Sequence, residues 1–330
     1  MDKKYDVVAL GELLIDFTEN GKSAQGNPIL EANPGGAPCN VLAMLKKLSH
    51  TVGFIGKVGL DMFGNQLEAA LHEVGIDTKG LRKDDSVHTT LAFVHTAPDG
   101  DRDFSFYRNP GADMMISEAD VDSCADMIAE TKLFHFGTLS MTGEICRSAT
   151  KHAIALAKEA GAVLSFDPNL REPLWDSLDT AKEQVLYGLS KCDILKISDN
   201  EIVWLTGEQD YHAGVAAIRK KYDIPLILVS LGREGSIAYS KSSRAIVPPF
   251  LQENTIETTG AGDTFCACVL HYVLEHGLRD YTEAELSEML TFANAGASII
   301  TTRKGALRVM PEKTEIEKLI KDCNTKPQRL

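Results

Sequence analysis

Short apolar runs alternate with stretches of helical periodicity along most of the chain. The apolar runs are rich in β-branched and aromatic residues, which is typical of buried strands. They lie at Tyr5–Leu10, Thr51–Val58, Lys132–Phe136, Val163–Phe166, Ile194–Ile197 and Leu226–Val229. Helical spacing is found at Cys39–Leu48, Gly64–Val74, Arg147–Glu159, Ala181–Ser190 and Tyr211–Lys221. This alternation predicts an α/β fold with a mostly parallel central sheet covered by helices on both faces.

Two segments, Leu13–Asn33 and Thr89–Arg108, depart from this alternation. The first carries turn signals at Asn20-Gly21 and Gly26-Asn27-Pro28, and the second predicts a hairpin whose turn is Ala97-Pro98-Asp99-Gly100. Both segments fit a small β element beside the main sheet, which would act as a lid over a ligand site. An ordinary surface hairpin explains the second segment equally well.

Composition limits the classes of protein that the chain can belong to. Its 330 residues contain no Pro/Ser-rich linker and no internal repeat, so we expect one domain over residues 1–330. No apolar run is long enough to span a membrane, and the first residues lack a signal-peptide core. The net charge of −13 argues against a nucleic-acid partner. The seven scattered cysteines are typical of free thiols, so we expect a cytoplasmic protein. Because no apolar run is long enough to span a membrane, we also expect no membrane partner.

The stretch from Glu257 to Phe265, Glu-Thr-Thr-Gly-Ala-Gly-Asp-Thr-Phe, is the most informative part of the sequence. Gly260, Ala261 and Gly262 let the backbone approach a ligand, and an apolar helix is predicted to begin at Thr264. The N-terminus of a helix favours an anion such as a phosphate. A carboxylate beside an anion site fits a base that accepts a proton from an attacking hydroxyl, so Asp263 indicates phosphoryl transfer. The competing interpretation is an aspartate that only complements the helix dipole.

Other phosphate-binding patterns are absent from the sequence. There is no G-x-x-x-x-G-K-[ST] loop and no protein-kinase Gly-rich loop or HRD element. Gly53, Gly56 and Gly59 have the wrong spacing for a dinucleotide fingerprint, and no helix is predicted to open on them. The histidines show no spacing typical of a metal site, and we expect most of them to be core or surface residues.

Two motifs about 220 residues apart together resemble the signatures of the ribokinase-like (PfkB) sugar kinase family. One is Glu257–Phe265, and the other is Gly35-Gly36-Ala37-Pro38-Cys39-Asn40-Val41. The resemblance extends over nearly the whole chain. It includes GELLIDF at 11–17, FYRNP at 106–110, DPNLR at 167–171, SLG at 230–232 and TRKGA at 302–306. Within the family, these sequence motifs are more similar to those of fructokinases than to those of ribokinases.

This resemblance implies an ATP-dependent sugar kinase whose catalytic base is Asp263. The amides of Gly260, Ala261 and Gly262 would stabilise charge on the transferred phosphoryl group. The positions that match the sugar-holding residues of the family are Asp16, Gly35, Gly36 and Asn40. Without the family, Asp16 would be interpreted as a strand-end carboxylate and Asn40 as a helix cap.

Arg108 and Arg171 are two basic residues that bear on the nature of the ligand, in a chain whose net charge is negative. By resemblance to fructokinases and to 2-keto-3-deoxygluconate kinases, both line the acceptor end of the site. An arginine there suits a hydroxyl-rich ligand, but it could equally pair with the carboxylate of a sugar acid. The alternative is an ordinary surface ion pair.

The residues that would bind the nucleotide are assigned by resemblance alone. Ser230, Gly232 and Gly235 lie in a loop similar to the one that approaches the ATP phosphates in the family, together with Gly262. Asn294 occupies a helical position similar to one that contacts the adenine edge.

Two cation sites are also implied by the family. Glu201 resembles the acidic residue that orders Mg²⁺ through water, but Ser198 stands where the family usually has Asn. The loops around five residues resemble a monovalent-cation cradle built from backbone oxygens: Glu257, Thr259, Ile300, Arg303 and Gly305. Glu257 replaces the usual Asp, which neither supports nor excludes activation by K⁺.

The favoured interpretation is a fructokinase that forms fructose 6-phosphate from fructose and ATP. The alternatives are a 2-keto-3-deoxygluconate kinase and, behind it, a ribose or nucleoside kinase. A sugar-binding regulator without turnover is less favoured, because a pure binding protein has no need for the base at Asp263. The exposed edge of the lid would offer a surface for a homodimer.

Overall fold

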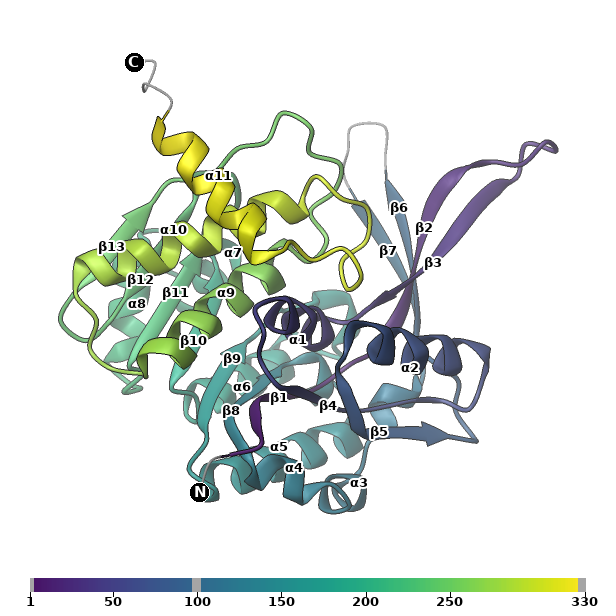
Figure 1. Cartoon of the computed structure of the whole chain (residues 1–330). Helices are drawn as coiled ribbons and strands as arrows, with labels where there is room; N and C mark the ends of the chain where they lie inside the picture. Colours follow the sequence, from purple (N-terminus) through teal and green to yellow (C-terminus); the bar gives the residue numbers. More distant parts are fainter. Residues whose placement is uncertain (1–2, 97–101, 326–330) are drawn as a thin grey trace.

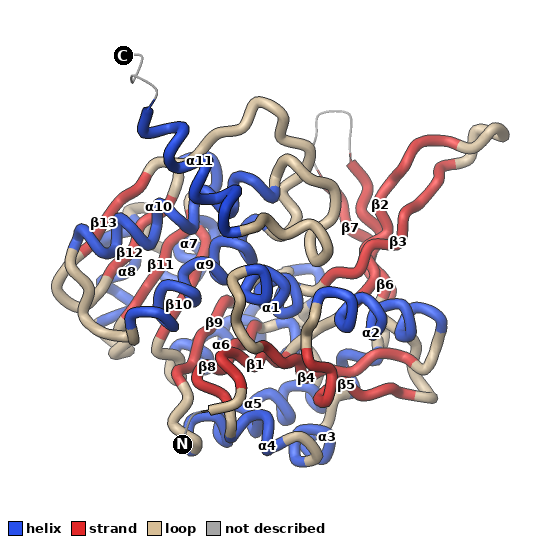
Figure 2. Tube along the Cα trace, in the orientation of Figure 1, coloured by secondary structure: helices blue, strands red, loops and turns tan. Residues whose placement is uncertain are grey.

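The computed structural model describes residues 3–96 and 102–325 of the chain. The turn predicted at Ala97–Gly100 lies outside the described residues. The chain forms one large sheet between two layers of helices, and a second, smaller sheet stands beside it (Figures 1 and 2). No helix in these described ranges is both long and apolar enough to cross a lipid bilayer.

The main sheet has nine strands in the order β13-β12-β11-β10-β9-β8-β1-β4-β5. Neighbouring strands are parallel from β5 to β11, whereas β12 and β13 pair antiparallel at one edge. The strands are β1 Tyr5–Leu10, β4 Val52–Gly59, β5 Asp77–Asp84, β8 Thr131–Gly137, β9 Val163–Asp167, β10 Ile194–Ser198, β11 Leu226–Ser230, β12 Ser236–Tyr239 and β13 Arg244–Val247. All six apolar runs predicted as strands are confirmed, and so is the mostly parallel sheet.

Both faces of the sheet are buried because each strand sends alternate side chains to opposite faces. In β1, Val7 and Ala9 join the core on one face, while Val8 and Leu10 join the core on the other. The first face is covered by α1 Ala37–Lys47, α2 Met62–Val74, α9 Ala261–His276, α10 Glu283–Ile300 and α11 Lys313–Thr325. The second is covered by α3 Glu118–Asp122, α4 Ala125–Ala129, α5 Glu144–Glu159, α6 Leu178–Leu189, α7 Asp199–Thr206 and α8 Tyr211–Arg219. Short 3₁₀ helices lie at Ala112–Met115, Leu139–Met141, Glu172–Leu174 and Gly232–Glu234.

The second sheet is built from the two segments that broke the helical rhythm of the sequence. Its strands are β2 Leu14–Lys22, β3 Pro28–Gly35, β6 Leu91–Thr96 and β7 Arg102–Tyr107, in the order β3-β2-β6-β7. Phe17 of β2 stacks on Phe93 of β6 at 4.8 Å and meets Phe63 of α2 edge-on at 5.6 Å. These aromatic contacts fix the base of the sheet against the body, while the β2–β3 hairpin projects away from it (Figure 1).

The start of α2 packs directly on the end of β4. Gly64 stands in the first turn of α2, and a Cβ atom built on it would lie 1.9 Å from the carbonyl oxygen of Gly59. The first turn is also fixed by Asp61, whose Oδ1 accepts a hydrogen bond from the Gly64 amide at 2.8 Å. Only glycine therefore fits this contact without moving the backbone.

We expect Gly64→Ala to destabilise the protein, although alanine is the better helix former by about 1 kcal/mol. Displacing a backbone carbonyl should outweigh this gain and lower the free energy of unfolding by about 2–3 kcal/mol. Urea denaturation followed by circular dichroism measures the change. Met62→Ala, at an exposed position of the same turn, is the control and should change little. A Gly64→Ala protein as stable as the parent would contradict the close contact.

Candidate active site

Two adjoining cavities open at the carboxyl ends of the parallel strands. Cavity 1 has a volume of about 450 Å³ and is lined partly by Thr18, Val94 and Phe106 of the second sheet. Cavity 2 has a volume of about 550 Å³ and lies between the end of β11 and helices α9 and α10. Thr258 and Gly262 line both cavities, so the two spaces meet at the start of α9.

Helix α9 begins inside the glycine motif rather than after it. Gly260 is the N-cap with φ 77°, a left-handed conformation that favours glycine, and Ala261 is the first helical residue. The predicted start at Thr264 was therefore three residues too late. The Ala261 amide donates to the Thr258 carbonyl at 3.2 Å, so it is committed to the turn. The amides of Gly262 and Asp263 stand at the helix N-terminus, where intrahelical partners are lacking.

Asp263 faces cavity 1 from the first turn of α9. Its Oδ2 accepts a hydrogen bond of 2.8 Å from Nδ2 of Asn40 on α1. Burial raises the pKa of Asp263, whereas the Asn40 bond and the positive charges of Lys196 and Arg171 act in the opposite direction. The result is a carboxylate that is held in one orientation and is more basic than an ordinary aspartate.

Asn40 also brings its amide oxygen to the wall of cavity 1 beside Asp263. Its Oδ1 is buried and accepts no hydrogen bond from any residue that the structure describes. Buried oxygens of this kind nearly always have a donor partner. Since Asn40 also lines cavity 1, a hydroxyl group of a bound ligand would supply that donor.

Of the remaining residues predicted to bind the sugar, Asp16 and Gly36 line the same cavity, and Gly35 lies against Asp16. Asp16 projects from β2 into cavity 1, and burial raises its pKa to about 7, with Arg171 opposing the shift. A Cβ atom on Gly35 would lie 2.2 Å from Oδ2 of Asp16. A Cβ atom on Gly36, where φ is 130°, would lie 2.4 Å from the carbonyl oxygen of Glu12. The glycine pair therefore makes room for the carboxylate and for the turn into α1.

The two predicted arginines have different environments. Arg108 is only 3% exposed, and its guanidinium binds Asp113 (2.7 and 2.8 Å), Thr142 (2.8 Å) and the carbonyl of Leu139 (2.9 Å). Arg108 does not line cavity 1, so the structure places it behind the wall rather than at the ligand. Arg171 follows β9, is exposed and does line cavity 1.

Lys196 is a site residue that the sequence analysis missed. It lies on β10, is 8% exposed and pairs with Asp167 at 3.0 Å. Burial lowers its pKa, but the carboxylates of Asp167 and Glu201 outweigh this and raise the pKa overall, so the ammonium stays charged. Its Nζ lies 3.3 Å from the position of a Cβ atom on Gly262, at the junction of the two cavities. A lone charge inside the apolar run Ile194–Ile197 is the sequence signal that could have revealed it.

The predicted nucleotide residues line cavity 2. Ser230 ends β11, and Gly232 and Gly235 follow in the next turn with φ 54° and 99°. A Cβ atom on Gly232 would meet nothing within 4 Å, so this loop offers bare backbone to a ligand. Asn294 also lines the cavity, but its amide is committed to Ser236 (2.8 Å) and to the carbonyls of 247 and 248 (both 3.1 Å). Its amide therefore positions the cavity wall.

Glu201 stands in the first turn of α7. Its Oε2 accepts from the amide and hydroxyl of Ser198, both at 2.8 Å, and its Oε1 accepts from the Leu170 amide at 2.7 Å. Ser198 caps α7 in return, which explains why serine serves the helix at this position. Three of about four lone-pair sites of the carboxylate are thus used, which leaves room for one water-mediated contact.

The residues predicted to cradle a monovalent cation come together in one place. Glu257 lies in the loop before α9, and its Oε1 accepts from the Gly305 amide at 2.8 Å. The backbone of 256 and 257 also binds the carbonyl of Thr301 at the end of α10. Ile300 and Arg303 belong to this same turn, and Thr259 is two residues from Glu257. The loop and the end of α10 are therefore one connected unit.

The chain is similar to known carbohydrate kinases over nearly its whole length. Residues 4–313 match the pfkB family of carbohydrate kinases. The chain is 41% identical over 317 residues to probable fructokinase-4 of Arabidopsis thaliana, which covers 96% of both chains. Fructokinase from Xylella fastidiosa with bound ATP superposes with a TM-score of 0.87 at 29% identity, covering 97% of this chain and 99% of that one. A double mutant of Vibrio cholerae fructokinase with fructose, ADP and potassium gives 0.83 at 28% identity, with the same coverage.

The fold, together with this similarity, defines a kinase that phosphorylates a small hydroxylated substrate. The chain belongs to the pfkB family of carbohydrate kinases, and it is an ATP-dependent sugar kinase.

The two arginines should respond differently to removal. Arg108→Ala leaves the buried Asp113 without its positively charged partner, so we expect the free energy of unfolding to fall by about 3–5 kcal/mol. Arg171→Ala should leave stability nearly unchanged, because the side chain is exposed, and should raise KM for the sugar. Denaturant unfolding and steady-state kinetics on both variants separate the two roles. Unchanged stability in Arg108→Ala, or an unchanged KM in Arg171→Ala, would overturn the respective assignment.

Proposed function

We propose that this kinase transfers the γ-phosphoryl group of ATP to the primary hydroxyl of D-fructose, giving fructose 6-phosphate and ADP. The observation that carries the proposal is the meeting of the two cavities at Gly262, with Asp263 facing cavity 1. A substrate in each cavity would place the attacking oxygen and the phosphorus on either side of one helix N-terminus. The similarity to fructokinases over nearly the whole chain supports the choice of sugar.

Cavity 1 has the chemistry of a neutral polyol site. Asp16 and Asn40 offer acceptors, Arg171 offers donors, and Gly36 brings backbone to the cavity wall beside the ring. Four acidic side chains line the cavity against two basic ones: Glu12, Asp16, Glu257 and Asp263 against Arg171 and Lys196. This balance favours an uncharged sugar over a carboxylate-bearing one.

Cavity 2 would hold ATP, with its phosphates directed toward Gly262. The bare backbone at Gly232 suits close approach of the nucleotide, and Ser230 and Gly235 line the cavity beside it. Asn294 would keep the wall in place through its bonds to Ser236 and the loop after β13. The helix N-terminus attracts the phosphate chain despite the acidic net charge of the protein.

The reaction follows from these positions. As the sugar oxygen attacks the γ-phosphorus, Asp263 accepts the hydroxyl proton, and the bond between phosphorus and the β,γ-bridging oxygen breaks to release ADP. The amides of Gly262 and Asp263 and the ammonium of Lys196 stabilise the charge that develops on the transferred group. Asn40 acts as a positioning residue, because it holds the Asp263 carboxylate toward cavity 1.

Two cations complete the proposal. Mg²⁺ would neutralise the phosphates of ATP, and Glu201 would contact one of its waters through its remaining lone pair. K⁺ would sit in the connected unit of 257–259 and 300–305, where it would stiffen the loop that leads into α9. Potassium accompanies fructose and ADP in the Vibrio cholerae relative.

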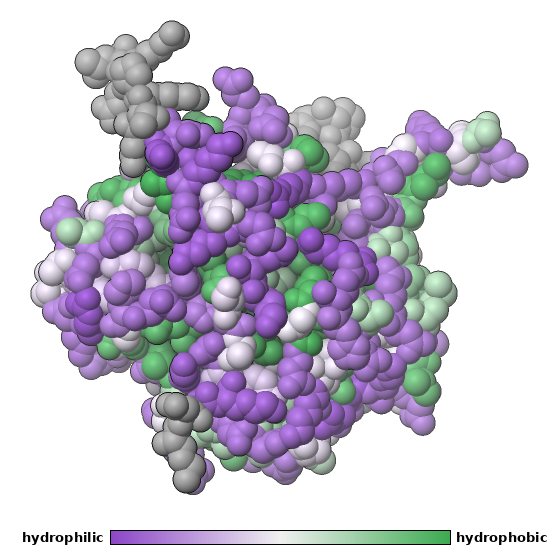
Figure 3. Space-filling view, viewed as in Figure 1, coloured by the Kyte–Doolittle hydropathy of each residue, from purple (hydrophilic) through white to green (hydrophobic). Residues whose placement is uncertain are grey.

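A homodimer formed through the second sheet is part of the same proposal. β3 and β7 are the edge strands of this sheet, and edge strands offer unpaired backbone groups to another chain. Ile29 and Leu30 of β3 are 45% and 41% exposed, and Figure 3 shows apolar side chains among polar ones on the projecting arm.

Six buried free thiols also fit the reducing cytoplasm expected from the sequence.

One observation favours a second acceptor, 2-keto-3-deoxygluconate. The exposed Arg171 lines cavity 1 and could pair with a carboxylate. The charge balance of the cavity opposes this acceptor, so it stands behind fructose.

We expect Asp263→Asn to reduce kcat by about 10²–10⁴-fold, because a general base contributes about that much. KM for the sugar should change little, since the base acts mainly in the transition state. ADP release assayed with saturating fructose measures the loss. Asp223→Asn, at an exposed position, is the control. A fall in kcat of less than tenfold would contradict the role of Asp263.

A panel of fructose, 2-keto-3-deoxygluconate, ribose and adenosine tests the substrate. We expect fructose to give the highest kcat/KM, because the acidic lining of cavity 1 disfavours the sugar acid and the similarity to fructokinases favours fructose over ribose and adenosine. The panel is measured by ADP release at equal concentrations of acceptor. A higher kcat/KM for the sugar acid would reject fructose as the substrate while leaving the kinase chemistry in place.

A further inference from the structure

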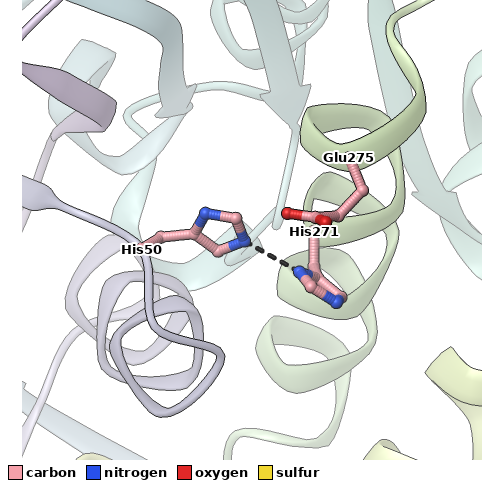
Figure 4. A group of neighbouring side chains, drawn as sticks. All are labelled: His50, His271 and Glu275. Carbon is pink, nitrogen blue, oxygen red and sulfur yellow. Dashed lines mark hydrogen bonds between the residues drawn. The ribbon is translucent and has the colours of Figure 1, made fainter.

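Two histidines and a glutamate meet about two helical turns from the catalytic motif, outside both cavities. They are His50, His271 and Glu275, and one ligand atom from each lies within 4.8 Å of the other two (Figure 4). Nε2 of His50 and Nδ1 of His271 are 2.8 Å apart. The mechanism proposed above uses none of these side chains.

The fold brings the three groups together from distant parts of the sequence. His50 lies in the connection between α1 and β4, whereas His271 and Glu275 are one turn apart on α9. Residues four apart on a helix share one face, so both α9 side chains point at the end of α1. His50 is 6% exposed, while Glu275 is exposed and gives solvent access to the cluster.

Behind His50 stands a carboxylate that orients its ring. Oδ2 of Asp6 lies 3.5 Å from Nδ1 of His50, and the same oxygen accepts from the Thr51 amide at 2.8 Å. Lys132 holds the other oxygen, Oδ1, at 2.8 Å. A carboxylate behind a ligating histidine fixes the tautomer, here with the proton on Nδ1 and the lone pair of Nε2 directed at the cluster.

We propose that His50, His271 and Glu275 form a site for a divalent transition metal of the zinc class. Two imidazole nitrogens and a carboxylate oxygen are a ligand set that Zn²⁺ takes, with water in the fourth position. In a tetrahedral shell with Zn–N distances of about 2.0–2.1 Å, the two nitrogens must stand about 3.3 Å apart. The pair therefore has to open by about 0.5 Å from its hydrogen-bonded distance, which a small rotation of the rings provides.

The bound ion would act as a clamp between α1 and α9. The same two helices carry Asn40 and Asp263, which hydrogen-bond to each other nearer their N-termini. Along α9, His271 is about 12 Å from Asp263 at 1.5 Å per residue. A metal at one end of this helix pair would thus stabilise the packing on which the catalytic hydrogen bond depends, without touching the substrates.

Metal titration of the full chain tests the site. Protein stripped with EDTA and free of nucleotide is titrated with Zn²⁺ by calorimetry and with Co²⁺ by visible absorption. We expect one ion per chain, tetrahedral Co²⁺ bands without thiolate charge transfer, and a rise in Tm of about 3–6 °C at a hundredfold excess over Kd. Asp6→Asn should weaken binding by about 10–100-fold, as expected when the partner of a ligating histidine is removed.

Three variants make the test specific. His271→Ala should abolish the site, and Glu275→Gln, at an exposed position that folding does not require, should weaken it at least about tenfold. His276→Ala, on the same helix but outside the cluster, should bind as the parent does. Failure of the parent to bind, equal binding by Glu275→Gln and the parent, or thiolate bands with Co²⁺ would each overturn the proposal. If His271→Ala does not fold, Glu275→Gln decides.

Discussion

The proposed reaction depends on one carboxylate, that of Asp263, which lies beside the place where the two cavities meet. Asp263 loses much of its hydration there, which raises its pKa and by itself would favour the neutral acid. The N-terminus of α9, the amide of Asn40 and the charges of Lys196 and Arg171 counter that cost. Each of these groups comes from a different element, so the proposed chemistry requires that α1, β10 and α9 pack together.

This constraint explains several features that would otherwise look unrelated. Gly260 adopts a left-handed conformation because the chain must turn sharply before the helix can begin at Ala261. Lys196 tolerates a nearly buried position because Asp167 pairs with it, and the pair places positive charge beside Gly262. The second sheet closes cavity 1 from the far side with Val94 and Phe106. Excluding water there would strengthen every electrostatic interaction around Asp263.

The sequence allowed the central strands, the second sheet and the glycine turn that leads into α9 to be predicted, because buried parallel strands and glycine turns leave strong local patterns. β5 was missed because this edge strand, Asp77–Asp84, is mostly polar, and β12 and β13 are too short to stand out. Arg108 was placed at the ligand because sequence position does not show which way a side chain turns, and Asp113 holds it elsewhere. The histidine cluster joins positions 221 residues apart, a proximity that only the fold creates.

The most direct measurement is a crystal structure of the protein with fructose and a non-hydrolysable ATP analogue. We expect the primary hydroxyl oxygen to lie about 3 Å from a carboxylate oxygen of Asp263, in line with the γ-phosphorus beside the Gly262 amide. A primary hydroxyl directed away from Asp263, or a γ-phosphate bound outside the junction of the two cavities, would contradict the central claim.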